Sequence, residues 1–158
     1  MSGVRVIWHL LAADAAVVAI AKRANIMAGT LPQSMPLPGI AVTQISSIPF
    51  RTLAMSLPLR LHTDRVQVTG FVKDQQSHPD GGDYPALVAL MKAILDACPN
   101  QHGTVNGVIV DSILPDIEGP DLPILDAGIL TRSRDFIVRY VDASYPAWLK
   151  ATGVVAVM

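Results

Sequence analysis

Three residues in one polar segment have side chains that could bind a metal ion. His78, Asp80 and Asp83 supply an imidazole and two carboxylates, and such nitrogen and oxygen donors bind divalent metals. The same segment has a simpler interpretation, because Asp80-Gly81 is typical of a turn and Asp83 of a helix N-cap. We favour this structural interpretation and predict no metal, and we keep a small metal-dependent enzyme that uses these three residues as an alternative.

The other reactive side chains also favour structural roles. The single cysteine, Cys98, ends an apolar helical pattern before Pro99, so we expect a buried thiol and no internal disulfide. His62 and Asp64 are interpreted as part of a turn. The sequence contains no GxxxxGK[ST], GxGxxG, HExxH, CxxC or GxSxG motif. We therefore predict no catalytic residues and no cofactor, although a site assembled in space leaves no motif.

The composition indicates a protein that assembles. Of the 158 residues, 51% are apolar and only 16% are charged, whereas about 25% are charged in an average domain. There are four lysines and a single glutamate, and these residue types are depleted where surfaces become interfaces. A net charge of −1 argues against nucleic-acid binding. We expect much of the outer surface to be covered by copies of this chain or by partners.

The first 23 residues predict an amphipathic helix over 4–23, in a protein assembled in the cytoplasm. The apolar run after Arg5 ends in Ala19-Ile20-Ala21, which resembles the cleavage site of a signal peptide. His9 and Asp14 interrupt that run, and it is too short and too polar to cross a bilayer. We therefore expect neither a signal peptide nor a membrane segment.

Apolar periodicity predicts the remaining elements. One helix is expected over 84–97, and strands are expected over 40–48, 53–61, 65–73, 104–114 and 129–142. The order of helix, strands, helix and strands favours an α/β (α+β) fold. It has a mostly antiparallel sheet of about four to five strands, with two main helices on one face and an extended β arm over 53–61. We expect one domain over 1–145 and an apolar C-terminal extension over 146–158.

Acidic and basic residues are segregated near the C-terminal end of this domain. Five acids and no base lie between Asp111 and Asp126, and Arg132, Arg134 and Arg139 follow. The simpler interpretation is a solvated loop beside an ordinary strand. The functional hypotheses are that neighbouring copies pair acidic loop with basic strand and so fix the register of a ring, or that the acids line a channel and repel a polyanion.

Two apolar segments are candidate contact surfaces. One is the alternating arm 53–61, and the other is the stretch 145–158, which either completes the core or docks on a partner. With the segregated charges, they give our predicted contacts between copies or with partners. These are Leu53, Met55, Leu57, Leu59, Leu61, Asp116, Glu118, Asp121, Arg132, Arg134, Arg139 and Trp148.

The order and spacing of these elements resemble the tail-completion or tail-terminator proteins of long-tailed bacteriophages. The resemblance covers residues 4–142 and rests on an alanine-rich first helix followed by four short matches. These are the strand opening over 37–42, the strand over 65–71, the helix after Asp83-Tyr84 and the closing strand over 134–140.

The resemblance implies a small α/β structural protein of the virion, without catalytic residues, that forms a hexameric ring. Such a ring caps the tail tube at the tail–neck junction and joins it to the head–tail connector or stopper protein, while DNA passes through the lumen without specific binding. The arm 53–61 is longer than is usual for the family, and 16 residues follow Asp142. These departures leave open a head-side stopper, another neck protein, or a host-side adaptor that docks a partner through either apolar segment.

Overall fold

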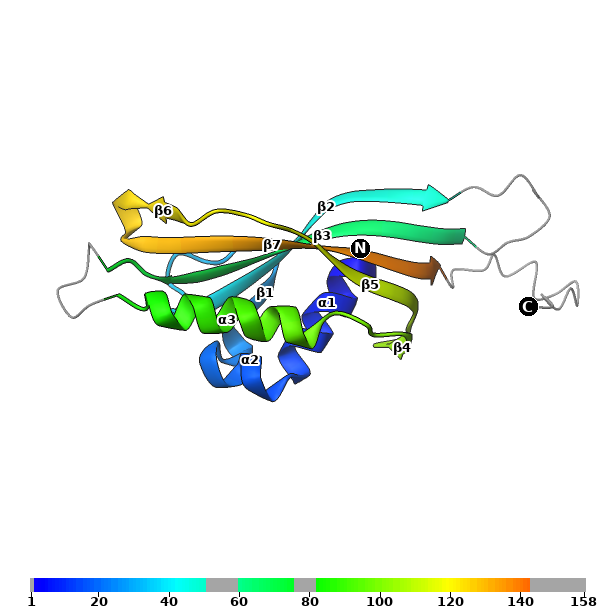
Figure 1. Cartoon of the computed structure of the whole chain (residues 1–158), viewed down its shortest axis with the longest axis horizontal. Coiled ribbons are helices and arrows are strands. Elements are labelled where there is room, and N and C mark those ends of the chain that lie inside the picture. The colour runs from blue at the N-terminus through cyan, green and yellow to red at the C-terminus, as the bar shows by residue number, and fades with distance from the viewer. Residues whose placement is uncertain (1, 51–59, 76–81, 143–158) are drawn as a thin grey trace, which may run out of the picture.

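The computed structural model describes residues 2–50, 60–75 and 82–142 (Figure 1). The helices are α1 (Ser2–Ala13), α2 (Ala15–Ile20) and α3 (Tyr84–Ala97), with short 3-10 turns η1 (Arg23–Asn25) and η2 (Leu125–Ala127). The strands are β1 (Ile26–Ala28), β2 (Gly39–Phe50), β3 (Arg60–Lys73), β4 (Gly103–Val105), β5 (Val108–Glu118), β6 (Leu122–Ile124) and β7 (Ile129–Asp142).

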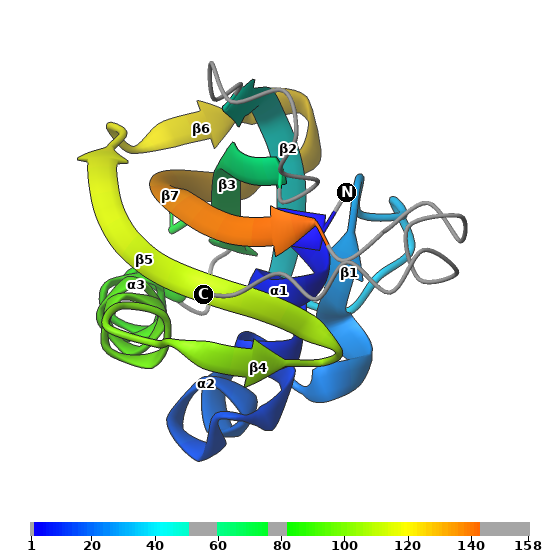
Figure 2. The same ribbon diagram turned by 90° about the vertical axis from the view of Figure 1, so that its right-hand side faces the viewer.

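These strands form one curled sheet (Figure 2). Its order is β1-β2-β3-β7-β5-β4, and β6 pairs with the start of β7. Only β1 and β2 run parallel among the described strands; the other pairs are antiparallel. The predicted α+β class and the mostly antiparallel sheet are confirmed. The sheet has seven strands, more than predicted, because β1, β4 and β6 are three residues each and too short to show a period of two.

The pair β3–β7 forms the centre of the sheet. Its register runs without interruption from Arg60 opposite Asp142 to Lys73 opposite Ile129. The flanking strands β2 and β5 both contain irregularities in register. Side chains alternate between the two faces of a strand. From Asp64 to Val72, the even positions of β3 therefore face the helices and are buried, while the odd positions point to the opposite face.

The core lies between the sheet and the helices α1 and α3. Phe136 on β7 is the largest of its fully buried side chains, and α1 contributes residues such as Ile7 and Leu11. Gly70 on β3 lets α3 approach the sheet, because a Cβ there would lie 3.3 Å from side-chain atoms of Leu87. The predicted arrangement of two main helices on one face is present, with the shorter α2 in addition.

The predicted continuous helix over 4–23 is wrong, because Asp14 divides it. Asp14 lies between α1 and α2, and its carboxylate accepts a hydrogen bond from the backbone N–H of Val17 at 3.0 Å. An aspartate side chain that can cap a new helix competes with continuation of the preceding one. The chain leaves α2 at Ile20, three residues before the predicted end of the helix, and passes through η1 into β1, a strand that was not predicted.

The predicted turn at 62–64 is also wrong, because these residues lie inside β3. Asp64 is fully buried and accepts a hydrogen bond from the backbone N–H of Gly3 at 3.0 Å. A carboxylate is favourable at this position because the first N–H groups of a helix have no partner within it. His62 stacks on Tyr140 with ring centroids 5.4 Å apart. Both polar residues are accommodated in a strand by tertiary contacts that local sequence does not reveal.

The last elements agree better with the sequence. The structure places α3 and β7 at the predicted bounds of 84–97 and 129–142. The strand predicted over 104–114 is divided into β4 and β5 by Asn106-Gly107, whose φ angles are 48° and 79°. This pair favours a tight hairpin. The arm predicted over 53–61 lies outside the described residues as far as residue 59, and Leu61 belongs to the start of β3.

Candidate assembly surfaces

The acidic segment and the basic strand pair with each other inside one chain. Arg132 donates two hydrogen bonds to the Asp121 carboxylate, from Nε at 2.6 Å and from Nη2 at 3.0 Å. The Tyr84 hydroxyl, at the start of α3, accepts from Arg132 and donates to Asp121, both at 3.2 Å. Arg134 forms an ion pair with Glu118. These contacts fasten the segment between β5 and β6 to β7 and α3.

A second network lies on the face of the sheet away from the helices. The Asp135 carboxylate accepts from Arg65 Nε at 2.8 Å and from Gln67 Nε2 at 3.0 Å. Arg65 also pairs with Asp116 at 3.3 Å. Three of the acids predicted to contact another copy, Asp116, Glu118 and Asp121, thus have arginine partners in their own chain. Contacts between copies through these acids and through Arg132 and Arg134 stay a prediction.

Replacing Asp121 by asparagine is expected to lower the free energy of unfolding at pH 7 by about 1 kcal/mol or less, as for other partly exposed ion pairs. The hydrogen bond from Arg132 lowers the pKa of Asp121 below its ordinary value. A carboxyl whose pKa is lowered in the folded state contributes stability above its unfolded pKa of about 4, and that contribution disappears as the pH falls through the folded value. Urea unfolding between pH 7 and pH 3 measures this.

The matched control is Asp96→Asn, which removes an exposed i,i+4 pair with Lys92 on α3. We expect the free energy of unfolding of Asp121→Asn to depend less on pH than that of wild type. Asp96→Asn should keep the pH profile of wild type. Parallel pH profiles for wild type and Asp121→Asn would contradict the assigned ion pair.

Exposed and half-buried apolar side chains form a row across β2, β3, β7 and β5 at one end of the sheet. The register places Phe50 opposite Leu61, Leu61 opposite Val141, and Val141 opposite Ile109. Cross-strand partners share a face, and Leu61 is at an odd position of β3, so the row faces away from the helices. Ile48 lies on the same face, opposite Thr63 and one row inward.

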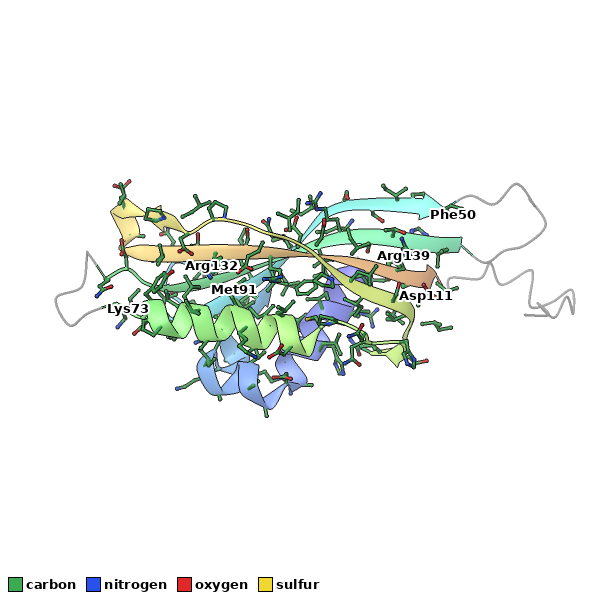
Figure 3. The ribbon with its side chains drawn as sticks, viewed as in Figure 1. Phe50, Lys73, Met91, Asp111, Arg132 and Arg139 are labelled. Carbon is green, nitrogen blue, oxygen red and sulfur yellow. The ribbon has the colours of Figure 1, made fainter. Side chains whose placement is uncertain are left out.

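We name these five residues, Ile48, Phe50, Leu61, Ile109 and Val141, the far plate. Ile48 is 63% exposed, Phe50 60% and Ile109 48%. The ends of β2, β3 and β7 that carry most of the plate extend past α1 (Figures 1 and 3). Among the predicted contacts, Leu61 belongs to the plate. Arg139 is exposed at the border of the plate, in the same row as Ile48 and opposite Thr63, and forms no ion pair within the described part of the chain.

The opposite end of the sheet carries an apolar groove of about 510 Å³. The proline-rich segment 31–37 forms one side of this groove, and the other side comes from the ends of β3, β6 and β7 and from η2. Phe71, Ile124 and Ile129 line it, together with Lys73, its only cation among the described residues. We name it the proline groove. Beside it, Leu125 on η2 is 72% exposed.

No family model matches the sequence, and no curated protein matches it. Solved structures do. One chain from a structure described as the virion of a native gene transfer agent (GTA) particle superposes with a TM-score of 0.56 at 14% sequence identity. The match covers 87% of this chain and 92% of that chain. The protein shares its fold with a virion chain. At this identity the likeness concerns the fold alone, and it extends over nearly the whole of both chains.

Several predicted residues lie outside the part that the structure describes. These are Leu53, Met55, Leu57, Leu59 and Trp148 among the contacts, and His78 and Asp80 of the metal alternative. Asp83 is at the N-cap position of α3, but its side chain makes no capping hydrogen bond, contrary to prediction. Within residues 2–50, 60–75 and 82–142, no three His, Cys, Asp or Glu side chains are grouped to hold a metal ion.

Cys98 is buried as predicted. Burial, with a smaller effect of the charge on Asp14, raises the pKa of its thiol, so the thiol stays protonated and is a poor nucleophile. None of the helices in the described ranges is both long and apolar enough to cross a membrane.

The far plate was not anticipated as a unit by the sequence. Leu61 was predicted as a contact, but Ile48 and Ile109 were assigned to ordinary strands, and Phe50 lies between two predicted strands. The available signal was that apolar residues continue along β2 into its exposed half, where seven consecutive residues from Gln44 to Phe50 are exposed.

Proposed function

We propose that this protein is a structural component of a virion that forms a closed ring. The fold shared with a chain of the gene transfer agent virion supports the virion role. The observation that carries the ring is the presence of two different apolar surfaces, the far plate and the proline groove, at opposite ends of one sheet. Contacts between two different patches generate rings when the rotation between neighbours closes.

The position that fits best is the end of the tail tube. As in the tail-terminator proteins that the sequence resembles, the ring would be hexameric, would cap the tube and would join it to the head–tail connector. Its mechanism is geometric, since one face copies the contacts of the next tube ring while the other offers no further site for tube protein. DNA would pass through the lumen without specific binding, and no catalysis is required.

The purified chain is expected to form a ring, alone or on addition of the tail tube protein of its virion. Native mass spectrometry gives the number of subunits, and negative-stain images show whether the ring sits at the end of a tube. Tubes polymerised in its presence should stop growing. A chain that stays monomeric even with tube protein would contradict the ring, and rings that leave tube growth unaffected would point to a head-side stopper or another neck protein.

A further inference from the structure

We propose that neighbouring copies join end to end, with the far plate of one copy seated on the proline groove of the next, and with Arg139 paired to Asp126 across this contact. The inference rests on the proposed function, since it assigns the contact that would build the ring. It commits to a second copy of this chain as the partner of both surfaces.

The apolar parts of the two ends are complementary in form. The far plate presents side chains that project from a sheet face, with Phe50 60% exposed. The other end presents a recess of about 510 Å³ with an apolar lining that includes Phe71 and Ile129. Aromatic and aliphatic side chains that enter such a recess lose contact with water, which is the main favourable contribution at the centre of an interface.

The second argument comes from exposed charges that form no ion pair within the described part of their own chain. Among the acids from Asp111 to Asp126, only Asp111 and Asp126 form no ion pair within the described residues. Of the three following arginines, only Arg139 forms none there. Arg139 and Asp126 are both exposed, and each borders one of the two apolar surfaces: Arg139 lies beside the far plate, and Asp126 lies between the groove residues Ile124 and Ala127.

Arg139 and Asp126 of one chain cannot reach each other. Asp126 precedes the start of β7 at Ile129, whereas Arg139 lies ten residues further along the same strand. At the rise of about 3.3 Å per residue of a strand, that is a separation of about 33 Å. A contact between them therefore requires two copies, each using a different end.

The remaining charges fit the same arrangement. Asp111 lies on β5 at the end that carries the far plate, and Lys73 lines the proline groove (Figure 3). Both are exposed and form no ion pair in the described ranges. Of these four residues, each end carries one acid and one base, so that end-to-end contact brings opposite charges together and the charges set the orientation of the copies.

The competing arrangement is a two-fold contact. Arg139 is opposite Ser112, the neighbour of Asp111, in the β5–β7 register, so Arg139 of one copy and Asp111 of another would pair through the same end of each. Such a contact closes after two copies. The apolar groove would then have no occupant, and this is why the observations favour Asp126 as the partner.

Charge reversal tests the inference. By native mass spectrometry over a concentration series, Arg139→Asp and Asp126→Arg are each expected to weaken assembly by about tenfold or more. The double variant, which restores opposite charges in swapped positions, should assemble at about the wild-type concentration. Lys92→Asp reverses an exposed charge on α3, away from both surfaces, and should assemble like wild type. Circular dichroism melts verify that the variants are folded.

The outcomes separate this inference from the proposed function. If wild type forms a ring and either single reversal leaves assembly unchanged, the end-to-end pairing is wrong while the ring stands. If Asp111→Arg rather than Asp126→Arg rescues Arg139→Asp, the contact is two-fold and the inference is wrong. If wild type remains monomeric with and without tube protein, the ring itself is wrong. A variant that does not fold is replaced by the neutral pair Arg139→Gln and Asp126→Asn, each of which should weaken assembly relative to wild type. Assembly of both at the wild-type concentration would contradict the pairing.

Discussion

Replacing Phe50 by aspartate is expected to abolish assembly while leaving the fold intact. Phe50 is 60% exposed and lies in the row that forms the far plate. In the isolated chain, the new carboxylate stays in water, so the free energy of unfolding should change by about 0.5 kcal/mol or less. In the assembled state, the carboxylate would be buried without a partner, which is expected to weaken association by about 100-fold or more.

The measurement is native mass spectrometry beside a thermal melt of the same sample. Val88→Asp is the matched control, because Val88 is an exposed apolar side chain on α3, 43% exposed and distant from the far plate. We expect Val88→Asp to assemble like wild type. If both variants lose assembly, general hydrophobic association is the cause. If Phe50→Asp assembles normally, the far plate is not a contact surface.

Replacing Phe136 by alanine is expected to destabilise the fold without altering a contact surface. It should lower the free energy of unfolding by about 3–5 kcal/mol. Phe136 is fully buried at the centre of the sheet, between Val66 on β3 and Pro115 on β5. The substitution removes most of a large apolar side chain and leaves a cavity that neighbours on two strands and the helices cannot fill. The far plate does not contain Phe136, so any loss of assembly should follow loss of folded protein.

Urea unfolding at neutral pH measures the change in free energy of unfolding. Phe136→Leu, which keeps most of the apolar volume, should cost about 1–2 kcal/mol by the same reasoning. Equal losses for the two substitutions would show that the site collapses around alanine, and would contradict a tightly packed core at this position.

Sequence periodicity was sufficient to predict an element and its bounds where that element buries one face over many residues. β7 alternates over 14 residues, and α3 has its apolar stripe between Pro85 and Pro99, so both were predicted at their observed bounds. Periodicity failed where a contact with one residue far away in sequence determines the secondary structure. Asp64 lies in a strand because it accepts from Gly3, 61 positions away in sequence, and no local pattern reports that partner.

The contact surfaces were predictable only in part, for a related reason. Segregation of acids and arginines led to the hypothesis that these charges pair between copies, which stays a prediction. The strand register instead brings Asp116, Glu118 and Asp121 to arginines of their own chain. Arg65, which was not among the predicted contacts, satisfies Asp116 because β3 and β5 both adjoin β7. Only after these pairs are assigned does Arg139 stand out as unpaired in the described part of the chain.

The uninterrupted β3–β7 pairing fixes the distance between the proline groove and the far plate. Fourteen paired positions run from the groove end to the plate end, a span of about 43 Å at the rise of a strand. If copies meet at these two ends, the diameter of the ring is set by the number of paired positions. Alternation further requires that this number change two residues at a time, so the spacing between neighbouring copies in related proteins would differ in steps of about 7 Å.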